Sequence, residues 1–381
     1  MINVAYLDYS HVFAGAEQVL YTIISNLDRS RFTPILIFPY SQNHHYRYGD
    51  LDCKKIYLNG GLKWWMGSDR WKHPLRGTDF LARTIWGFQL ASVLKKKKVD
   101  ILHVNLLRPD CLMWLLPVKK AGIKIVGHFR SQALEWIPSA KVQKCCDLVL
   151  CVSKYSRSRF LTKGDFVESK ALYDSIDINK FCCELSKEEA KKKLGFSENV
   201  FLISSVGQLS RHKGHDNAIL AFSKIADRYP NAVLYIAGGG ADLSYLKTLA
   251  SKDAKVTSRI FFSEKQVSNI QEIYKASDLV LSLTKVGEAF GLVPYEATLL
   301  GASFIGPEFG AIKEFVKDKE NGVLVNTNNV DDIATQIEWV INHPKECVEM
   351  KEKLKVLINE RLTPKIMANK LMDEYELLMS K

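Results

Sequence analysis

Two glutamates eight residues apart, Glu288 and Glu296, mark the stretch of this sequence best suited to chemistry. The residues after Glu288 read as a loop that enters a short helix ended by a glycine, so Phe290, Gly291 and Leu292 would offer backbone N–H groups at a helix N-terminus. Such an end attracts phosphate. Carboxylates on both sides could accept sugar hydroxyl protons, which suggests a sugar nucleotide. The spacing alone fits two solvated glutamates near a helix start about as well.

A second anion site is predicted about 80 residues earlier in the chain. The apolar strand 200–206 runs into a turn that contains Gln208, Arg211, Lys213 and Gly214, and a helix follows. Lys213 could approach a diphosphate as a point charge, and Gly214 would let the backbone close in. Basic turns are common, so this feature gains weight only from the glutamate loop in the same sheet pattern.

The chain shows two successive series of short apolar strands that alternate with helical segments. This order is typical of an α/β fold with parallel sheets. We predict an N-terminal domain over residues 1–180 and a second domain over 181–363, with a helix at 364–381 that returns to the first. The expected strands are 2–7, 34–38, 101–104, 123–126, 148–152, 200–206, 232–237, 260–262, 279–283, 303–305 and 322–325.

Composition indicates a globular protein with an unevenly distributed charge. Of 381 residues 47% are hydrophobic and 25% are charged, and the formal net charge is +11. Residues 1–180 carry 27 basic and 15 acidic residues, whereas residues 181–381 carry 26 and 27. An anionic partner is therefore expected for the first half. The eight cysteines form no CxxC pair, and no apolar run is long enough to span a membrane, so a reduced, cytoplasmic protein is expected.

The stretch 59–98 interleaves basic residues with aromatic ones. It contains Trp64, Trp65, Trp71 and Trp86, and it ends in four consecutive lysines. This composition fits a peripheral contact with a membrane surface. It fits equally a helix that packs its tryptophans inward and leaves a solvated lysine end.

Two residues of the first half could lie at ligand-binding strand ends. Gly15 falls at the first junction between a strand and a helix, and His128 follows the strand 123–126. Open parallel sheets bind their ligands at such edges. A tight turn and a structural histidine are the simpler interpretations of these two residues.

With these elements in place, the chain resembles the retaining family 4 glycosyltransferases of bacterial surface-polysaccharide synthesis. The resemblance implies the GT-B fold, with two Rossmann-like doubly wound domains that face each other across a cleft. It is strongest over residues 200–326 and looser before them. The matching segments are GQLSRHKG (207–214), IAGGG (236–240), EAFGLVPYE (288–296), GAIKEFVKDKENGVLV (310–325), and more faintly AGAEQVL (14–20), GHF (127–129), CDLVLCVSKYSR (146–157) and LYDSIDINKF (172–181).

The resemblance also implies roles for individual residues. Glu288 would contact donor-sugar hydroxyls, Glu296 the ribose, and Lys213 the leaving diphosphate. His128 would lie beside the donor sugar, and Gly15 would border the donor phosphate and the acceptor. The amides of 290–292 would bind phosphate. This sequence departs from the family pattern at Gln208, where an arginine is usual, with Arg211 as a candidate substitute, and at Asp174-Ser175, where Asn-Gly is common.

The expected reaction transfers a sugar, with retention, from a nucleoside-diphosphate sugar to a saccharide or lipid-linked saccharide. No metal or other cofactor is expected, because amides and Lys213 could hold the diphosphate charge. The expected partners are that donor, that acceptor and an anionic membrane surface at the inner face of the cytoplasmic membrane, with no nucleic acid.

Three alternatives stay open at this point. A sugar-nucleotide epimerase would share the two-domain fold but needs an acid/base set that His128 alone does not supply. A dinucleotide-dependent oxidoreductase would need a GxGxxG fingerprint after the first strand, which this sequence lacks. A nucleic-acid-binding protein would use the basic half, although no recognition module is visible.

Overall fold

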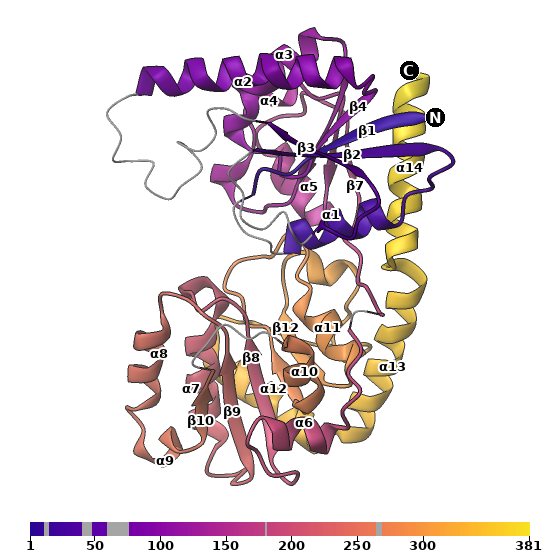
Figure 1. Cartoon of the computed structure of the whole chain (residues 1–381). Helices are drawn as coiled ribbons and strands as arrows, with labels where there is room; N and C mark the ends of the chain where they lie inside the picture. The colour runs from indigo at the N-terminus through magenta and orange to yellow at the C-terminus, as the bar shows by residue number, and fades with distance from the viewer. Residues whose placement is uncertain (11–14, 40–47, 59–75, 180, 264–268) are drawn as a thin grey trace. The chain divides into compact units, whose positions relative to one another are not determined.

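The computed structural model describes residues 1–10, 15–39, 48–58, 76–179, 181–263 and 269–381 (Figure 1). The chain forms two compact units. The first comprises Met1–Ser175 together with Pro364–Lys381, and the second comprises Ile176–Thr363. The chain therefore passes from the first unit to the second after Ser175, where the sequence suggested 180, and returns before Pro364.

The first unit contains a seven-stranded parallel sheet in the order β3-β2-β1-β4-β5-β6-β7. The strand order reverses between β1 and β4, which pair directly through Leu7 and Val104. This is the doubly wound topology that the sequence predicts. The strands are β1 (Ile2–Leu7), β2 (Phe32–Pro39), β3 (Lys54–Leu58), β4 (Ile101–Val104), β5 (Lys124–Phe129), β6 (Leu148–Cys151) and β7 (Ser169–Ala171).

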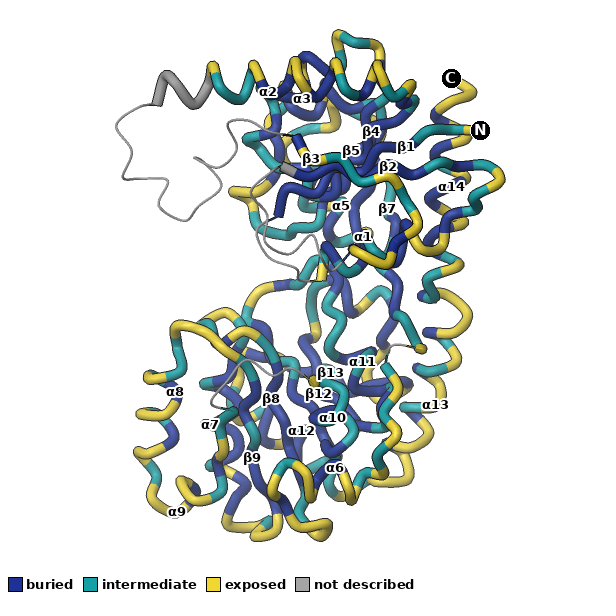
Figure 2. Tube along the Cα trace, viewed as in Figure 1, coloured by how far each residue is buried: buried dark blue, intermediate teal, exposed yellow. Residues whose placement is uncertain are grey.

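Helices cover both faces of this sheet, because alternate strand residues point to opposite sides. In β1, Val4 and Tyr6 pack with α1 and α14, whereas Ala5 and Leu7 pack with α2 and α3. Figure 2 shows the central strands, such as β4, as the most deeply buried part of the unit. The helices are α1 (Gly15–Ser25), α2 (Arg76–Lys96), η3 (Pro109–Cys111), α3 (Leu112–Lys120), η4 (Leu134–Trp136), α4 (Ala140–Gln143), α5 (Lys154–Leu161) and α14 (Pro364–Ser380).

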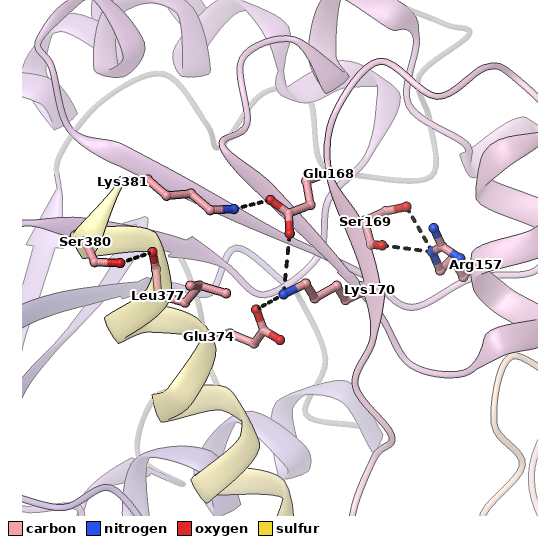
Figure 3. A network of polar contacts seen from close by, with 8 residues as sticks. All are labelled: Arg157, Glu168, Ser169, Lys170, Glu374, Leu377, Ser380 and Lys381. Atoms are coloured by element: carbon pink, nitrogen blue, oxygen red, sulfur yellow. Dashed lines mark hydrogen bonds and ion pairs between the residues drawn. The ribbon is translucent and has the colours of Figure 1, made fainter.

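The C-terminal helix α14 docks on the first unit, although the second unit precedes it in the chain. Its apolar face contributes Leu371 and Tyr375 to the core beside β1. At its edge, Lys170 of β7 binds Glu374 at 2.6 Å, and the side chain of Lys381 reaches Glu168 at 2.5 Å (Figure 3). Burial of the apolar face is the main attachment, since partly exposed ion pairs contribute little.

Helix α2 corrects part of the membrane prediction. Trp86 is 2% exposed and meets Trp114 of α3 edge to face, with 5.9 Å between ring centroids. It therefore belongs to the core and not to a membrane-facing surface. The same helix exposes Leu81, Ile85 and Phe88. The tryptophans Trp64, Trp65 and Trp71 of the predicted stretch lie outside the described residues.

The second unit has a six-stranded parallel sheet in the order β10-β9-β8-β11-β12-β13. Its strand order reverses between β8 and β11, which are neighbours. The strands are β8 (Phe201–Val206), β9 (Ala232–Ala237), β10 (Ile260–Phe262), β11 (Leu279–Leu281), β12 (Ser303–Pro307) and β13 (Val323–Val325). The two units thus share one topology, and the fold class predicted from sequence is confirmed.

Helices again lie on both faces of the second sheet. One core forms beneath α7, α8 and α12, and smaller clusters form beneath α6, α10 and α11. The helices are α6 (Lys187–Lys193), η5 (Arg211–Lys213), α7 (His215–Ile225), α8 (Leu243–Ala250), α9 (Ala254–Thr257), α10 (Ile270–Ala276), α11 (Val293–Leu299), η6 (Ala311–Glu314), α12 (Val330–Asn342) and α13 (Pro344–Arg361). In the part of the chain that the structure describes, none of the helices has both the length and the apolar character of a membrane span.

Candidate functional site

The switch point of the second sheet brings the two predicted anion-binding loops together. The turn with Lys213 follows β8, and the loop with Glu288 follows β11. Because β8 and β11 are adjacent and parallel, both loops leave the same edge of the sheet. Ligands of doubly wound sheets bind at this point.

Backbone contacts join the two loops closely. The amide of Lys285 donates to the carbonyl of His212 at 2.7 Å, and the Thr284 hydroxyl donates to the same carbonyl at 3.2 Å. Gly214 has φ of 73°, and a Cβ there would lie 1.9 Å from the carbonyl oxygen of Leu283. Only glycine therefore fits this crossing.

Two ion pairs bridge the same loops. Lys213 donates to Glu288 Oε1, and both side chains are partly exposed, at 31% and 21%. Lys285 binds Asp216 at 2.7 Å. The ammonium and the carboxylate predicted to meet the donor thus contact one another, where a ligand could approach both.

His215 holds the turn that carries Lys213. Its Nε2 lies 3.1 Å from the carbonyl of Gln208, and its Nδ1 lies 2.8 Å from the Ser205 hydroxyl. A carbonyl only accepts, so Nε2 carries the proton and Nδ1 accepts from the hydroxyl. Burial lowers the pKa of His215 to about 4. The ring is therefore neutral and fixed at pH 7.

The Glu288 loop is packed against glycines. Gly291 has φ of 84°, and a Cβ there would lie 2.7 Å from Glu288 Oε2. The amide of Ala311 donates to the Glu288 carbonyl at 3.3 Å. A small open pocket lies beside the carboxylate, lined by Ser282, Glu288, Phe290, Gly291, Pro294, Pro307, Phe309, Ala311 and Ile312.

Glu296 lies in the first turn of α11, the helix predicted from sequence at 292–300. Its Oε2 accepts a hydrogen bond of 3.1 Å from the hydroxyl of Tyr274 on α10. Burial, followed by the nearby Glu296 charge, raises the pKa of Tyr274 well above its usual value. The tyrosine is thus a permanent donor that orients the carboxylate.

The remaining predicted residues of this unit lie around the same loops. Phe290 is buried and stacks on Tyr295, with 5.6 Å between ring centroids, and Leu292 is the N-cap of α11. The Gln208 side chain is exposed. Arg211 lies over the ring of Tyr245 at 3.4 Å and pairs with Asp242 at 3.5 Å. The charge proposed to replace the missing family arginine therefore already has an acidic partner.

In the first unit, His128 lies inside a strand and not after one. It is the penultimate residue of β5 and is fully buried. Its Nδ1 is 3.2 Å from His103 Nε2 and 3.1 Å from Arg130 Nη2. Burial and then the Arg130 charge hold the pKa of His128 well below its usual value. Gly15 is the first residue of α1 and is exposed, and the residues just before it lie outside the described part of the chain.

Sequence reasoning missed several residues that organise these sites. In the second unit they are Tyr274, His215 and the Asp216–Lys285 pair. His215 directly follows the recognised turn, and its position after a glycine at a helix start could have drawn attention. Tyr274 gave no signal, because it belongs to a separate helix. Among the described residues, no group of three or more His, Cys, Asp or Glu side chains could hold a metal ion.

Two family models match the chain, one in each unit. The model described as Glycosyl transferases group 1 matches residues 186–356, and the model described as Glycosyltransferase Family 4 matches residues 13–172. Together they span most of the sequence. The chain therefore belongs to the glycosyltransferases that combine these two units, and it is an enzyme of the transferase class.

Curated relatives and solved structures agree with this assignment. An uncharacterized glycosyltransferase of Methanocaldococcus jannaschii is 27% identical over 71% of this chain and 74% of its own. A GDP-mannose-dependent alpha-(1-6)-phosphatidylinositol monomannoside mannosyltransferase of Mycolicibacterium smegmatis is 26% identical over 73% and 76%. Anabaena HepE, solved with UDP, superposes with a TM-score of 0.80 at 19% identity over 98% of this chain and 100% of its own. These likenesses identify the fold as GT-B.

Proposed function

We propose that this protein is a retaining glycosyltransferase that uses a nucleoside-diphosphate sugar and glycosylates a saccharide or lipid-linked saccharide. The observation that carries the proposal is the contact between Lys213 and Glu288 at the switch point of the second sheet. A diphosphate sugar presents an anion next to hydroxyl groups. A paired ammonium and carboxylate can meet both, the lysine turning to phosphate and the glutamate to a hydroxyl.

The supporting contacts fit the same ligand. The Tyr274 hydroxyl holds the carboxylate of Glu296 at the start of α11, where it would accept ribose hydroxyls. The amides of 290–292 would meet phosphate oxygens. For the first unit we keep the roles implied by the resemblance, with His128 toward the donor sugar and Gly15 toward the donor phosphate and acceptor.

The reaction would break the bond between the anomeric carbon and the diphosphate oxygen. The acceptor oxygen would bond to that carbon on the same face, and its proton would pass to the leaving phosphate. Lys213 would stabilise the charge that develops on the diphosphate, a kind of preorganised electrostatic stabilisation often worth ~10²–10³ in rate. We propose that no metal ion is required for this step.

The first experiment is a thermal-shift comparison with UDP, GDP, ADP, CMP and NAD. Both a GDP-mannose-dependent relative and a UDP-bound structural neighbour are known, so the base is the first unknown. A ligand at ~100 times its dissociation constant stabilises a protein by roughly 2.7 kcal/mol. We expect one nucleoside diphosphate to raise the melting temperature, and its effect to weaken in Glu296→Gln.

A matched control is Glu338→Gln, which removes a carboxylate of α12 that pairs with Arg228, beyond the C-terminal end of α7. It should leave the nucleotide shift unchanged. A shift with NAD alone would overturn the assignment of the site. So would a nucleotide shift in Lys213→Ala and in Glu296→Gln that is as large as that of the wild type. With the base known, the anomeric configuration of the product, read by proton NMR, tests retention.

We further propose a lipid-linked acceptor at the inner face of a bacterial cytoplasmic membrane, in surface-polysaccharide synthesis. The basic first half and the exposed Leu81, Ile85 and Phe88 of α2 support this location. Vesicles with anionic lipid should bind the protein at low salt and release it as salt screens the charges. Neutral vesicles are the control, and absence of binding to anionic vesicles would remove the membrane from the proposal.

A further inference from the structure

A chain of buried polar side chains in the first unit converges on His128. The ring of His128 meets that of His103 on the neighbouring strand β4, with 5.3 Å between ring centroids, on the side of the sheet that α1 and α14 cover. His103 Nδ1 is 2.7 Å from the hydroxyl of Tyr375, which itself lies 3.3 Å from the Tyr6 hydroxyl. On the other side, Arg130 donates to His128 and binds Asp174 at 2.5 Å.

The chemistry of these partners fixes the proton on His128. A guanidinium nitrogen can only donate, so the Nδ1 atom that faces Arg130 Nη2 must be an acceptor. The proton of the neutral ring is then on Nε2. His103 Nε2 lies 3.2 Å from the same lone pair, so it can meet that atom only as a second donor that shares the lone pair with Arg130. Its own Nδ1 can then only accept, so the single phenolic proton of Tyr375 is shared between this nitrogen at 2.7 Å and the Tyr6 hydroxyl at 3.3 Å.

We infer that Arg130, held by Asp174, and His103, held by Tyr375, are positioning residues that keep His128 as the neutral Nε2–H tautomer. His128 is then a hydrogen-bond donor and not a base. The Arg130–Asp174 pair is almost fully buried, with side-chain exposures of 5% and 13%. The guanidinium is held further by its Nε, which donates to the carbonyl of Asn105 at 3.2 Å.

The donor on His128 has no partner among the described residues. Its Nε2 is buried, and so is a second unpartnered polar atom, Oδ1 of Asn105, which follows β4. A buried donor without an acceptor costs about 1–3 kcal/mol, so such an atom in a native protein needs an explanation. Both atoms lie near the carboxyl ends of adjacent strands, where a ligand oxygen would satisfy the donor.

The network of side chains around His128 has two arms, Arg130 with Asp174 and His103 with Tyr375. The outer residue of each arm comes from a segment that flanks the second unit in the sequence. Asp174 immediately precedes the passage of the chain out of the first unit, and Tyr375 belongs to the helix that follows its return. The tautomer of His128 therefore depends on both connections. Members of the family that this chain resembles commonly have asparagine where Asp174 stands. The ion pair between Arg130 and Asp174 is therefore a particular property of this sequence.

The direct test is the protonation state of His128 in the ligand-free full chain at pH 7. Long-range proton–nitrogen NMR of protein labelled with ¹⁵N-histidine distinguishes the two tautomers, and His128→Gln identifies the signals. We expect the Nε2–H form alone. The Nδ1–H form would overturn the inference.

Variants then test each arm. Arg130→Gln with Asp174→Asn removes both charges together and so leaves no buried lone charge. We expect a mixture of His128 tautomers in this double variant, and a changed His103 signal in Tyr375→Phe. The matched control is Lys119→Gln with Asp147→Asn. In the native protein Lys119 Nζ lies 2.7 Å from Asp147 Oδ1, at the opposite end of β5, so this double variant should leave His128 unchanged. An unchanged His128 in the double variant and an unchanged His103 in Tyr375→Phe would contradict the positioning role.

The consequence for sugar binding rests on the proposed function. If His128 donates to the bound donor sugar, the Arg130/Asp174 double variant should lower kcat/KM by about tenfold, the equivalent of one hydrogen bond. If the wild-type protein binds no nucleoside-diphosphate sugar, the proposed function is refuted and the NMR result stays valid. A wrong tautomer in an active wild type would refute only this inference.

Discussion

The two units share one strand order, but they hold the residues of their switch points in different ways. In the second unit, adjacent loops cross backbone to backbone, with Gly214 against the carbonyl of Leu283. In the first unit, a buried chain of side chains, from Tyr375 through His103 to His128, performs the same task. The same topology is thus combined with two different kinds of support.

The difference determines how each site can fail. A backbone crossing tolerates exchange of many side chains but cannot admit a Cβ atom. A side-chain network tolerates small shifts of backbone but depends on the protonation state of every member. The second unit should therefore be sensitive to added volume, and the first unit to added protons.

The largest expected effect is that of Gly214→Ala. The new Cβ would need a positive φ and would meet the Leu283 carbonyl, so we expect a loss of about 2–4 kcal/mol in unfolding free energy. Urea denaturation measures this loss. Nucleotide binding should weaken as well, because Lys213 precedes the displaced residue.

Two glycines provide matched controls for this substitution. Gly195 also has a positive φ, of 86°, but a Cβ there would have no neighbour within 4 Å, so Gly195→Ala isolates the backbone cost of about 1 kcal/mol. In the first unit, the three atoms nearest to a Cβ on Gly127 would all belong to the side chain of Leu107, at 2.6 to 3.1 Å, so the crowding there is with a side chain and not with a backbone carbonyl. A Gly214→Ala loss no greater than that of Gly195→Ala would show that the backbone crossing is unimportant.

The same contrast explains what the sequence could predict. Local patterns placed all six strands of the second unit and the loop residues Lys213 and Glu288, because each loop directly follows an apolar run. The strands β3 and β7 were missed, since KKIYL and SKA are short and bear lysines. The partners of His128 come from residues as distant as Arg130 and Tyr375. No local pattern links them, because their proximity is created by sheet order and by the return of α14.

A second prediction concerns the unfolding free energy of each unit as the pH is lowered. Burial lowers the pKa of His103 to about 3, that of His215 to about 4, and that of His128 well below its usual value. In the unfolded chain these histidines take up protons near pH 6.5, whereas in the folded protein their rings stay neutral there. Stability is therefore greatest above pH 6.5 and falls as the pH drops, by up to about 1.4 kcal/mol per histidine and pH unit.

Among the described residues, the first unit holds two such histidines and the second unit one, so these groups should cost the first unit about twice as much stability between pH 6.5 and 5.5. Hydrogen exchange in β5 and β8, corrected for intrinsic rates, reports each unit separately. Burial raises the pKa of Asp174, so proton uptake by this carboxyl would oppose the loss of stability in the first unit. His215→Gln should remove most of the effect in the second unit only. Equal losses in both units of the wild type would contradict the comparison.

The smallest expected effect concerns the surface attachment of α14. Lys170 and Glu374 are about a quarter to a third exposed, at 31% and 23%, and lie 2.6 Å apart. A double-mutant cycle with Lys170→Gln and Glu374→Gln should give a coupling of about 0.2–1 kcal/mol, which weakens with salt. Tyr375→Phe, one residue further along the helix, removes a buried hydroxyl and should cost about 1–2 kcal/mol. If the surface pair proved the stronger of the two, α14 would be held to the first unit mainly at its edge, and the buried network would owe its order to that ion pair.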